Sequence, residues 1–357
     1  MGPLTFHPVL KRTRWGGRRL GTMLGKPLPD GADYAESWEI CDHGIDQSVV
    51  DRGTWAGKTL HELVRDFPHE LLGQHSQRTQ FPLLLKFLDA HDRISVQVHP
   101  DDNQVAQLDT DEMGLHQNGK SEAWVILAAE PESQLFVGLK QHVDRPMLES
   151  KLAASELEDC LHRLSVQAGD VVFVPAGTVH AIGEGILLAE VQQTSDITYR
   201  LSDWGRLDQQ GRPRPLHLKQ AMKCIDFDRG PIEPQRPETV LSKTLTADDA
   251  IQVEQIVACE HFVIHRYLSR DPFHVRLDDR FHILMVLDGN GHLRQDNETS
   301  PITNPVPADV RCIGSSRANG IEVFPLSIGQ TILLPASCPP LSIQPDGNLT
   351  LLDVFVP

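Results

Sequence analysis

The sequence predicts a mainly β fold of two antiparallel jelly-roll barrels, with a few helices added to the N-terminal half. The 25 prolines and 26 glycines are scattered among short apolar runs, which suits short strands better than long helices. A weak repeat relates residues 169–176 (GDVVFVPA) to residues 329–336 (GQTILLPA). Each copy is a turn glycine, an apolar strand and a proline. We therefore expect one barrel within residues 1–235 and a second within residues 236–357. One large sandwich with irregular additions fits this length less well.

The N-terminal third carries the best-defined helix signal. Segment 59–72 (TLHELVRDFPHELL) has apolar residues at helical spacing. Thr59, followed three positions later by Glu62, forms a potential capping box. Pro68 is expected to end or kink this helix.

The remaining elements follow from apolar periodicity and from the turn residues between them. Two further helices are expected over residues 145–161 and 218–224, the second within an exposed connection at 205–238. Strands are expected over residues 82–88, 94–98, 123–128, 135–137, 170–174, 186–192, 198–201, 262–268, 281–287, 330–334 and 350–356.

Charge and cysteine content narrow the function classes. The net charge of −16 argues against general nucleic-acid binding, and the basic stretch at 11–19 is short and interrupted by Trp15. An anionic substrate would therefore need a local cluster of Arg and Lys. The six cysteines form no CxxC motif, and no targeting or membrane-spanning segment is evident. We expect a cytoplasmic protein with reduced thiols, and a monomer or small homo-oligomer.

A polar strand face is the first sign of a functional site. If residues 94–98 form a strand, Ser95, Gln97 and His99 point the same way, because side chains alternate along a strand. A face buried in the core should be apolar, and a face exposed to water should carry more charge. A strand that lines a polar cavity explains the pattern, and an edge strand with ordinary polar residues is the alternative.

Two further segments carry residues of metal-site chemistry. Lys120 and Glu122 share a face just before an apolar strand, although such a pair is usually a solvated ion pair. In the segment that runs from Gly169 to His180, Pro175 and Gly177 are expected to form a tight bend that turns the histidine inward. A buried structural histidine is the alternative. Together, the three segments offer an amide oxygen, two imidazoles and a carboxylate, a set that suits zinc, with iron, cobalt or manganese also feasible. These candidate ligands are Gln97, His99, Glu122 and His180.

The spacing that ends at His180 resembles the second sequence motif of the cupin superfamily, in which this histidine is a metal ligand. The chain has Gln97-x-His99 where cupins usually have His-x-His, and Glu122 lies much further along the chain than the superfamily pattern places it. These departures favour a narrower family. The chain resembles the short bacterial form of type I mannose-6-phosphate isomerase. The segments that carry the resemblance are 14–17 (RWGG), 36–39 (ESWE), 57–60 (GKTL), 81–86 (FPLLLK), 95–102, 177–180 and 190–200.

The resemblance implies a metal-dependent aldose–ketose isomerase that interconverts mannose 6-phosphate and fructose 6-phosphate. It implies cupin-type barrels and one Zn2+ per chain on the four candidate ligands. It also implies an active-site Arg200, with Ser95, Lys120 and Glu190 in the pocket. We add Arg206 as a candidate phosphate ligand beside Ser95 and Lys120, and Trp15 as a candidate pocket wall.

The second barrel is expected to lack a metal, because residues 337–340 read SCPP where a metal site would need Gly and His. Other functions stay open. His99, Glu122 and His180 alone would suit an Fe(II) oxygenase, against which Gln97 and Lys120 argue. A non-catalytic sugar-phosphate-binding cupin and an isomerase for another sugar phosphate are the remaining alternatives.

Overall fold

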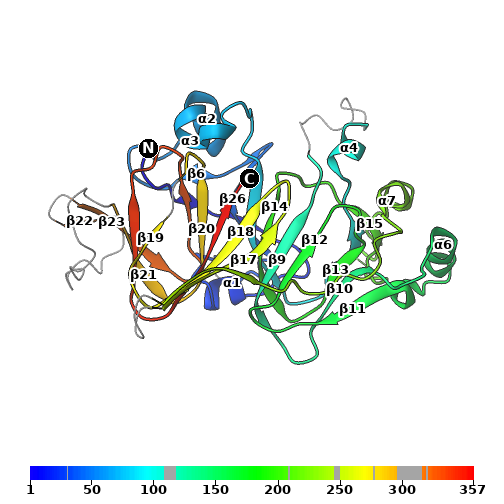
Figure 1. The fold of residues 1–357 in the computed structure, drawn as a ribbon. Helices are drawn as coiled ribbons and strands as arrows, with labels where there is room; N and C mark the ends of the chain where they lie inside the picture. Colours follow the sequence, from blue (N-terminus) through cyan, green and yellow to red (C-terminus); the bar gives the residue numbers. More distant parts are fainter. Residues whose placement is uncertain are drawn as a thin grey trace.

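The structure is a computed structural model that describes residues 1–29, 31–107, 118–207, 210–244, 250–275, 278–295, 316–318 and 321–357. Strands dominate it, so the predicted mainly β class is confirmed. Figure 1 shows the strands gathered in two neighbouring units. Within the described ranges, no helix combines the length and the apolar character that crossing a membrane requires.

Two sheets form the first unit (Figure 1). The six-stranded sheet has the order β12-β9-β14-β7-β3-β2, and its strands are β12 (Val171–Val174), β9 (Glu122–Ala129), β14 (Ile186–Gln193), β7 (Leu83–Ala90), β3 (Glu36–Ile40) and β2 (Val9–Lys11). The five-stranded sheet has the order β11-β10-β13-β8-β15, and its strands are β11 (Leu161–Ser165), β10 (Gln134–Leu139), β13 (His180–Ile182), β8 (Val96–Val98) and β15 (Tyr199–Ser202).

Two sheets also form the second unit. The six-stranded sheet has the order β16-β17-β18-β26-β20-β24, and its strands are β16 (Glu238–Thr244), β17 (Ala250–Ala258), β18 (Val263–Ser269), β26 (Leu349–Phe355), β20 (His282–Asp288) and β24 (Thr331–Leu334). The five-stranded sheet has the order β19-β25-β21-β23-β22, and its strands are β19 (Phe273–Val275), β25 (Leu341–Pro345), β21 (Asn290–Gln295), β23 (Ile321–Ser327) and β22 (Ser316–Ala318).

The two units repeat one strand order. When the strands of each six-stranded sheet are ranked along the chain and read from β12 or from β24, both run fifth, fourth, sixth, third, second, first. The repeated sequence segments supply the matching edge strands, β12 and β24. A left-handed glycine precedes each of them, Gly169 with φ 92° and Gly329 with φ 79°. The sequence repeat therefore marks equivalent positions in the two units.

The helices of the described ranges are short and lie outside the sheets (Figure 1). They are α1 (Arg19–Thr22), α2 (Leu60–Asp66), α3 (Pro68–Leu72), α4 (Asp102–Val105), α6 (Arg145–Ala153) and α7 (Leu218–Cys224), with 3-10 turns η1 (Gly73–His75) and η2 (Leu157–Cys160). Two small strand pairs, β1 (Phe6–His7) with β6 (Val49–Val50) and β4 (Asp42–His43) with β5 (Asp46–Gln47), complete the N-terminal part.

The helix predicted over residues 59–72 is confirmed in its details. Thr59 accepts a hydrogen bond from the Glu62 backbone N–H, and the Glu62 carboxylate accepts one from the Thr59 backbone N–H, so the capping box is present. The helix breaks at Phe67, and Pro68 begins the next one, α3. The chain bends here because proline can begin a helix but cannot continue one.

The helix predicted over residues 145–161 is wrong in its length. The helix ends at Ala153, and Ser155 adopts a left-handed conformation with φ 61°. Leu157 and Leu161 nevertheless pack in the same apolar cluster as Leu148 of the helix, one from a 3-10 turn and one from a strand. The spacing of these leucines therefore resembles that of one helix face, although the helix itself ends before them.

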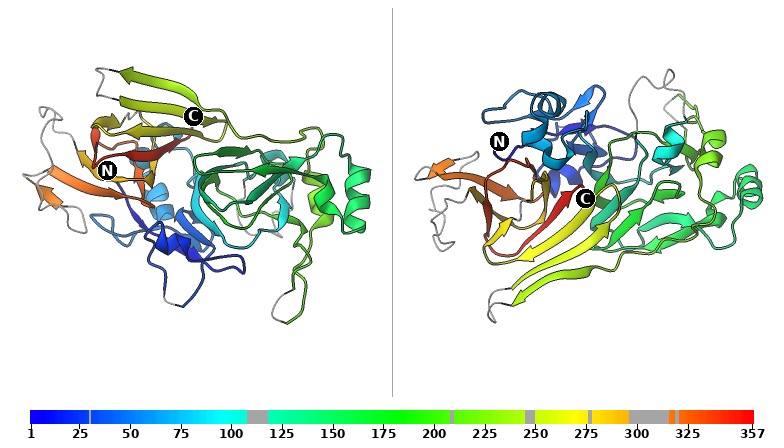
Figure 2. Two further views of the ribbon diagram at one scale, coloured as in Figure 1. Left: turned by 90° about the horizontal axis from the view of Figure 1, so that it is seen from below. Right: turned by 45° about the horizontal axis from the view of Figure 1, so that its top comes forward.

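One apolar core joins the two units. It contains Phe87 of β7 and Val191 of β14 from the first unit, and Ile283 of β20 and Val354 of β26 from the second. The N-terminal segment takes part as well, since Leu4 exchanges two backbone hydrogen bonds with Leu333 of β24. Figure 2 shows the blue N-terminal segments next to the orange and red strands of the second unit. The division of the chain at residues 235 and 236 stays a prediction, since the first residues contact the second unit.

Candidate metal centre and active site

Three candidate residues lie side by side on the five-stranded sheet. His180 of β13 pairs with Gln97 of β8, which in turn pairs with Arg200 of β15. Residues directly opposite each other on neighbouring strands present their side chains on the same face. Val96 and Val98, the neighbours of Gln97, lie on the other face in a separate apolar cluster. The alternation expected from the sequence thus separates a polar face from an apolar one.

A second polar line lies on the six-stranded sheet of the same unit. Glu190 of β14 pairs with Lys86 of β7 on one side and with Trp124 of β9 on the other. Glu122 begins β9 two positions before Trp124, so its side chain shares that face. The polar residues of the two sheets face each other in the space between the sheets, where Glu122 contacts His180.

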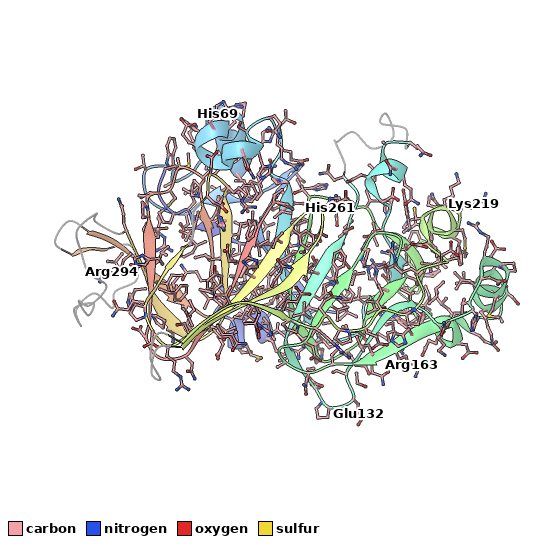
Figure 3. The ribbon with its side chains drawn as sticks, viewed as in Figure 1. His69, Glu132, Arg163, Lys219, His261 and Arg294 are labelled. Carbon is pink, nitrogen blue, oxygen red and sulfur yellow. The ribbon has the colours of Figure 1, made fainter. Side chains whose placement is uncertain are left out.

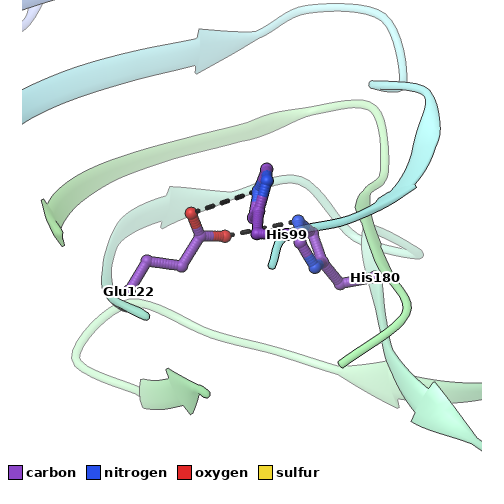
Figure 4. Close-up of side chains that lie close together, drawn as sticks. All are labelled: His99, Glu122 and His180. Atoms are coloured by element: carbon purple, nitrogen blue, oxygen red, sulfur yellow. Dashed lines mark ion pairs between the residues drawn. The ribbon is translucent and has the colours of Figure 1, made fainter. Parts of the chain in front are cut away.

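His99, Glu122 and His180 form a group of buried potential ligands (Figure 4). One ligand atom from each lies within 4.8 Å of the others. The Glu122 Oε1 atom is 3.3 Å from His180 Nε2, and the Oε2 atom is 3.6 Å from His99 Nε2. Among the described residues this is the one group of three or more His, Cys, Asp or Glu side chains with this geometry.

Both imidazoles present the Nε2 atom to the cluster. The Nδ1 atom of His99 lies 2.7 Å from the Ile197 carbonyl, and that of His180 lies 3.0 Å from the Thr178 carbonyl. A carbonyl can only accept, so Nδ1 carries the proton and Nε2 is the unprotonated nitrogen of each ring. Burial lowers the pKa of His99 well below its ordinary value and that of His180 to about 4. Both rings are therefore neutral, which is the form that binds a metal.

The carboxylate of Glu122 fits a bound cation. Its side chain is almost fully buried, and burial raises the pKa of this group to about 8 although Lys120 opposes the shift. Lys120 lies 3.2 Å from its Oε2 atom. A buried carboxylate that faces two neutral imidazoles is costly unless a further positive charge balances it. The donor set and its burial therefore suit a divalent cation.

Gln97 lies beside the three residues. Its amide Nε2 atom is 3.2 Å from His180 Nε2, and Ser95 Oγ is 3.3 Å from its Oε1 atom. A half-turn of the amide group exchanges nitrogen and oxygen, so Gln97 can present its oxygen to an ion in this position.

The bend before His180 depends on Gly177. This residue has φ +85°, and a Cβ atom added there would lie 3.1 Å from the Cys224 carbonyl oxygen. Its backbone N–H donates to the His99 carbonyl over 2.8 Å. The bend predicted from Pro175 and Gly177 thus connects the chain just before His180 to the backbone of His99.

A cavity of about 360 Å³ opens beside this cluster. Most of the candidate residues proposed from the sequence line it, namely Trp15, Ser95, Gln97, Lys120, Glu122, Glu190 and Arg200. Trp15 and Ser95 are buried in its wall. Lys120 reaches the cluster itself, with Nζ 3.2 Å from His99 Nε2.

Arg206 is not brought to this cavity. It lines a different cavity, and its guanidinium is paired with Asp203 at 2.7 Å and with Asp92 at 3.0 Å. The sequence suggested Arg206 as a candidate phosphate ligand, but it lies apart from Arg200, which lines the cavity. The two residues differ because β15 ends at Ser202 and the chain then turns away.

Four charged residues that sequence reasoning gave no role also line the cavity: Glu36, Lys86, Asp196 and Arg214. Lys86 is almost fully buried, with Nζ 3.4 Å from both Glu36 and Glu190. A lysine inside the apolar run 81–88 was the signal that could have indicated it. No comparable local signal indicates Arg214, which lies in the polar connection.

Glu190 is held as a carboxylate by its surroundings. Burial raises its pKa, but Lys86 and then Lys120 outweigh burial, so the pKa of Glu190 lies below its ordinary value. Its Oε1 atom accepts a hydrogen bond of 3.0 Å from the Trp124 indole N–H. Two buried carboxylates of one cavity thus differ, since the pKa of Glu122 is raised and that of Glu190 is lowered.

The matching place in the second unit has different chemistry. Glu122 pairs with Val174 just before Pro175, and His282 pairs with Leu334 just before Pro335, so the two positions correspond. The ring nitrogens of His282 face Asp353 at 2.8 Å and Asp278 at 3.2 Å. Both nitrogens are therefore engaged by carboxylates and offer no lone pair to a metal.

Comparisons with known proteins match this geometry to one family. Residues 4–136 match the family described as phosphomannose isomerase type I, catalytic domain. The chain is 32% identical over 350 residues to the mannose-6-phosphate isomerase of Streptococcus mutans, covering 98% of this chain and 97% of the relative. It is 34% identical over 298 residues to the mannose-6-phosphate isomerase ManA of Bacillus subtilis, covering 82% of this chain and 87% of the relative.

A solved structure agrees over the whole length. The crystal structure of the mannose 6-phosphate isomerase from Bacillus subtilis superposes with a TM-score of 0.83 at 28% sequence identity, covering 100% of both chains. The sequence matches and this superposition cover the strands that carry the buried cluster as well as the second unit. This chain belongs to the type I mannose-6-phosphate isomerase family.

Proposed function

We propose that this protein is a metal-dependent isomerase that interconverts mannose 6-phosphate and fructose 6-phosphate. Family membership supplies the reaction class. The observation that carries the proposal is the buried group of His99, Glu122 and His180 beside a polar cavity that also holds Glu190 and Arg200. We further propose a cytoplasmic location, in keeping with free thiols at all five cysteines of the described ranges.

Zinc is the metal that we propose for this centre. Two imidazole Nε2 atoms and a carboxylate are ligands that zinc prefers, and the Gln97 amide oxygen as fourth donor would complete a four-coordinate site. When bound, the ion would supply Lewis acidity to the oxygens of the sugar and balance the buried charge of Glu122.

Glu190 is the residue that we propose for proton transfer. Isomerisation moves a hydrogen from C2 of the aldose to C1 of the ketose, and a second proton moves from the C2 oxygen to the C1 oxygen. A base must take the C2 proton and return it to C1. Glu190 is buried, ionised and part of the cavity, and the indole of Trp124 fixes its orientation.

Arg200 and Lys120 are the residues that we propose to stabilise the negative charge on the sugar oxygens during the reaction. Loss of the C2 proton produces an enediolate, whose negative charge needs positive groups that are already in place. Arg200 lies on the opposite sheet from Glu190 and lines the same cavity. Lys120, near Glu122, can donate a hydrogen bond to a sugar oxygen bound beside the metal centre.

Metal dependence can be tested with an assay that couples fructose 6-phosphate formation to a colour change. The wild-type protein should turn over mannose 6-phosphate, lose activity on chelation and regain it with zinc. His99→Ala should lose bound zinc and lower kcat/KM by more than about 100-fold. Arg200→Ala should keep its zinc and lower kcat by about 100- to 1000-fold.

His69→Ala is the matched control, because His69 is exposed on α3 (Figure 3). It should behave like the wild-type protein. Full turnover by His99→Ala or after complete removal of metal would contradict the metal mechanism. Bound iron together with oxygen consumption would support an Fe(II) oxygenase instead, and phosphate-sugar binding without turnover would support a non-catalytic cupin.

A further inference from the structure

Four cationic side chains line the cavity beside the metal centre, and two of them already contact carboxylates of the cavity. Lys86 lies between the carboxylates of Glu36 and Glu190. Lys120 contacts Glu122 and His99 at the metal centre. The remaining cations are Arg200 and Arg214.

Arg200 holds the segment that follows Arg214 against the cavity. The Arg200 Nη1 atom donates to the Pro215 carbonyl over 3.0 Å. The backbone of Arg200 also accepts a hydrogen bond from the His217 N–H over 2.8 Å, and its own N–H donates to the His217 ring at 3.1 Å. The segment that carries Arg214 therefore lies against β15 and is not a free loop.

In the described ranges, the arginines at positions 200, 206 and 214 contact only two carboxylates. The carboxylate of Asp203 is shared between Arg206 at 2.7 Å and Arg214 at 3.4 Å, and Arg206 takes a second carboxylate from Asp92. Arg200 forms no ion pair with a carboxylate of the described ranges, and its Nε atom is buried without a hydrogen-bond partner. Burial lowers the pKa of Arg200, and repulsion from Arg214 lowers it further.

We propose that Arg214 binds the phosphate dianion of the sugar phosphate, beside Arg200 at the sugar oxygens, and makes the enzyme selective for phosphorylated substrates. The inference rests on the proposed function and adds to it a residue that the sequence did not indicate. Arg214 shares its carboxylate, Asp203, with Arg206, so its guanidinium can take up an anion, and a planar fork matches phosphate oxygens in pairs. Arg206 cannot take this role, because its guanidinium is saturated by Asp203 and Asp92.

Arg214→Ala tests this assignment. In steady-state assays with mannose 6-phosphate its KM should rise about 10- to 100-fold, as expected for the loss of charge-assisted hydrogen bonds, while kcat stays within about threefold. Its zinc content should match the wild-type protein. Calorimetric titration with inorganic phosphate should show a parallel loss of affinity. Arg214→Lys should recover part of both effects, because it keeps the charge and loses the fork.

Arg212→Ala is the matched control, since Arg212 is an exposed arginine of the same connection and does not line the cavity. It should leave KM and phosphate affinity unchanged. Unchanged KM and phosphate affinity in Arg214→Ala, or equal losses in Arg212→Ala, would overturn the assignment. Phosphate binding that requires Arg214 in a protein without turnover would support the anion site and refute the isomerase proposal. A wild-type protein that does not bind phosphate would refute the anion site.

Discussion

Lys86 shows how much a single buried charge contributes to this site. Its ammonium group lies 3.4 Å from both Glu36 and Glu190, and 4.8 Å from the centre of the Trp38 ring. All of these groups are wholly or largely buried. Without the lysine, two carboxylates would share a site of low dielectric constant with no cation between them. The same residue that orders the cavity therefore also supports the fold.

Lys86→Met should lower the free energy of unfolding by about 3–5 kcal/mol, the usual cost of removing one partner from a buried ion pair. Urea unfolding followed by circular dichroism provides the measurement. Lys11→Met is the control, because Lys11 and Asp46 form a partly exposed pair, and its effect should stay within about 1 kcal/mol. If both substitutions lowered the free energy of unfolding equally, the buried Lys86 would contribute no more to stability than the partly exposed Lys11.

At the scale of elements, paired strands decide which chemistry each unit has. β9 and β14 bring Glu122 and Glu190 into the first unit, and the corresponding strands β20 and β26 bring His282 and Asp353 into the second. One strand order thus supports a candidate metal centre in one unit and a histidine–carboxylate cluster in the other. The groups that face His282 are Asp353, Asp278, the Phe355 ring and, through Asp278, Arg280.

This cluster should make stability depend on pH. Burial lowers the pKa of His282, but Asp353 and Asp278 outweigh it, so the pKa is raised in the folded protein. Protonation therefore favours the folded state. The contribution is complete below the ordinary histidine pKa of about 6.5 and is lost as pH rises through the higher folded value. Urea unfolding of the wild-type protein from pH 5.5 to 9 should show this loss.

His282→Gln should remove this pH-dependent part, so the stability difference between wild-type and variant should shrink as pH rises. The exposed His69, changed to Gln, is the control and should leave the wild-type profile unchanged. A difference between wild-type and His282→Gln that stays constant from pH 5.5 to 9 would show that His282 is not charged in the folded protein.

On the scale of the whole molecule, the shared core makes the two units one structure. Phe81 before β7 and Phe281 before β20 meet with ring centroids 4.7 Å apart, and both are fully buried. The N-terminal segment contributes to the same core and adds backbone hydrogen bonds to β24. A substitution that destabilises the second unit should therefore also destabilise the first.

Phe281→Ala should lower the free energy of unfolding by about 3–5 kcal/mol, the usual cost of removing a buried phenylalanine ring. All five tryptophans lie in the N-terminal part, between Trp15 and Trp204. Tryptophan fluorescence therefore reports the first unit, and its transition should shift together with that seen by circular dichroism. Two separate transitions, with the fluorescence transition at its wild-type position, would contradict a shared core.

The sequence by itself determined what local spacing can encode. The capping box at Thr59, the glycine bend before His180 and the polar face of Gln97 and His99 are each carried by a few consecutive residues, because turn chemistry and side-chain alternation act over that range. The mainly β class follows from the same local rules. The candidate ligands His99, Glu122 and His180 came from such motifs and from the family resemblance, and they lie together in the fold.

Only the tertiary structure decided which distant groups share a cavity. The register between β7 and β14 places Lys86 beside Glu190, and the turn after β15 leads Arg206 to Asp92 and Asp203, whereas Arg214 reaches the cavity. The left-handed Ser155 also ended a helix that periodicity alone would have extended. The physical reason is that hydrophobic periodicity tells which face of a strand is buried, whereas strand pairing and the matching of buried charges depend on contacts between residues far apart in the chain.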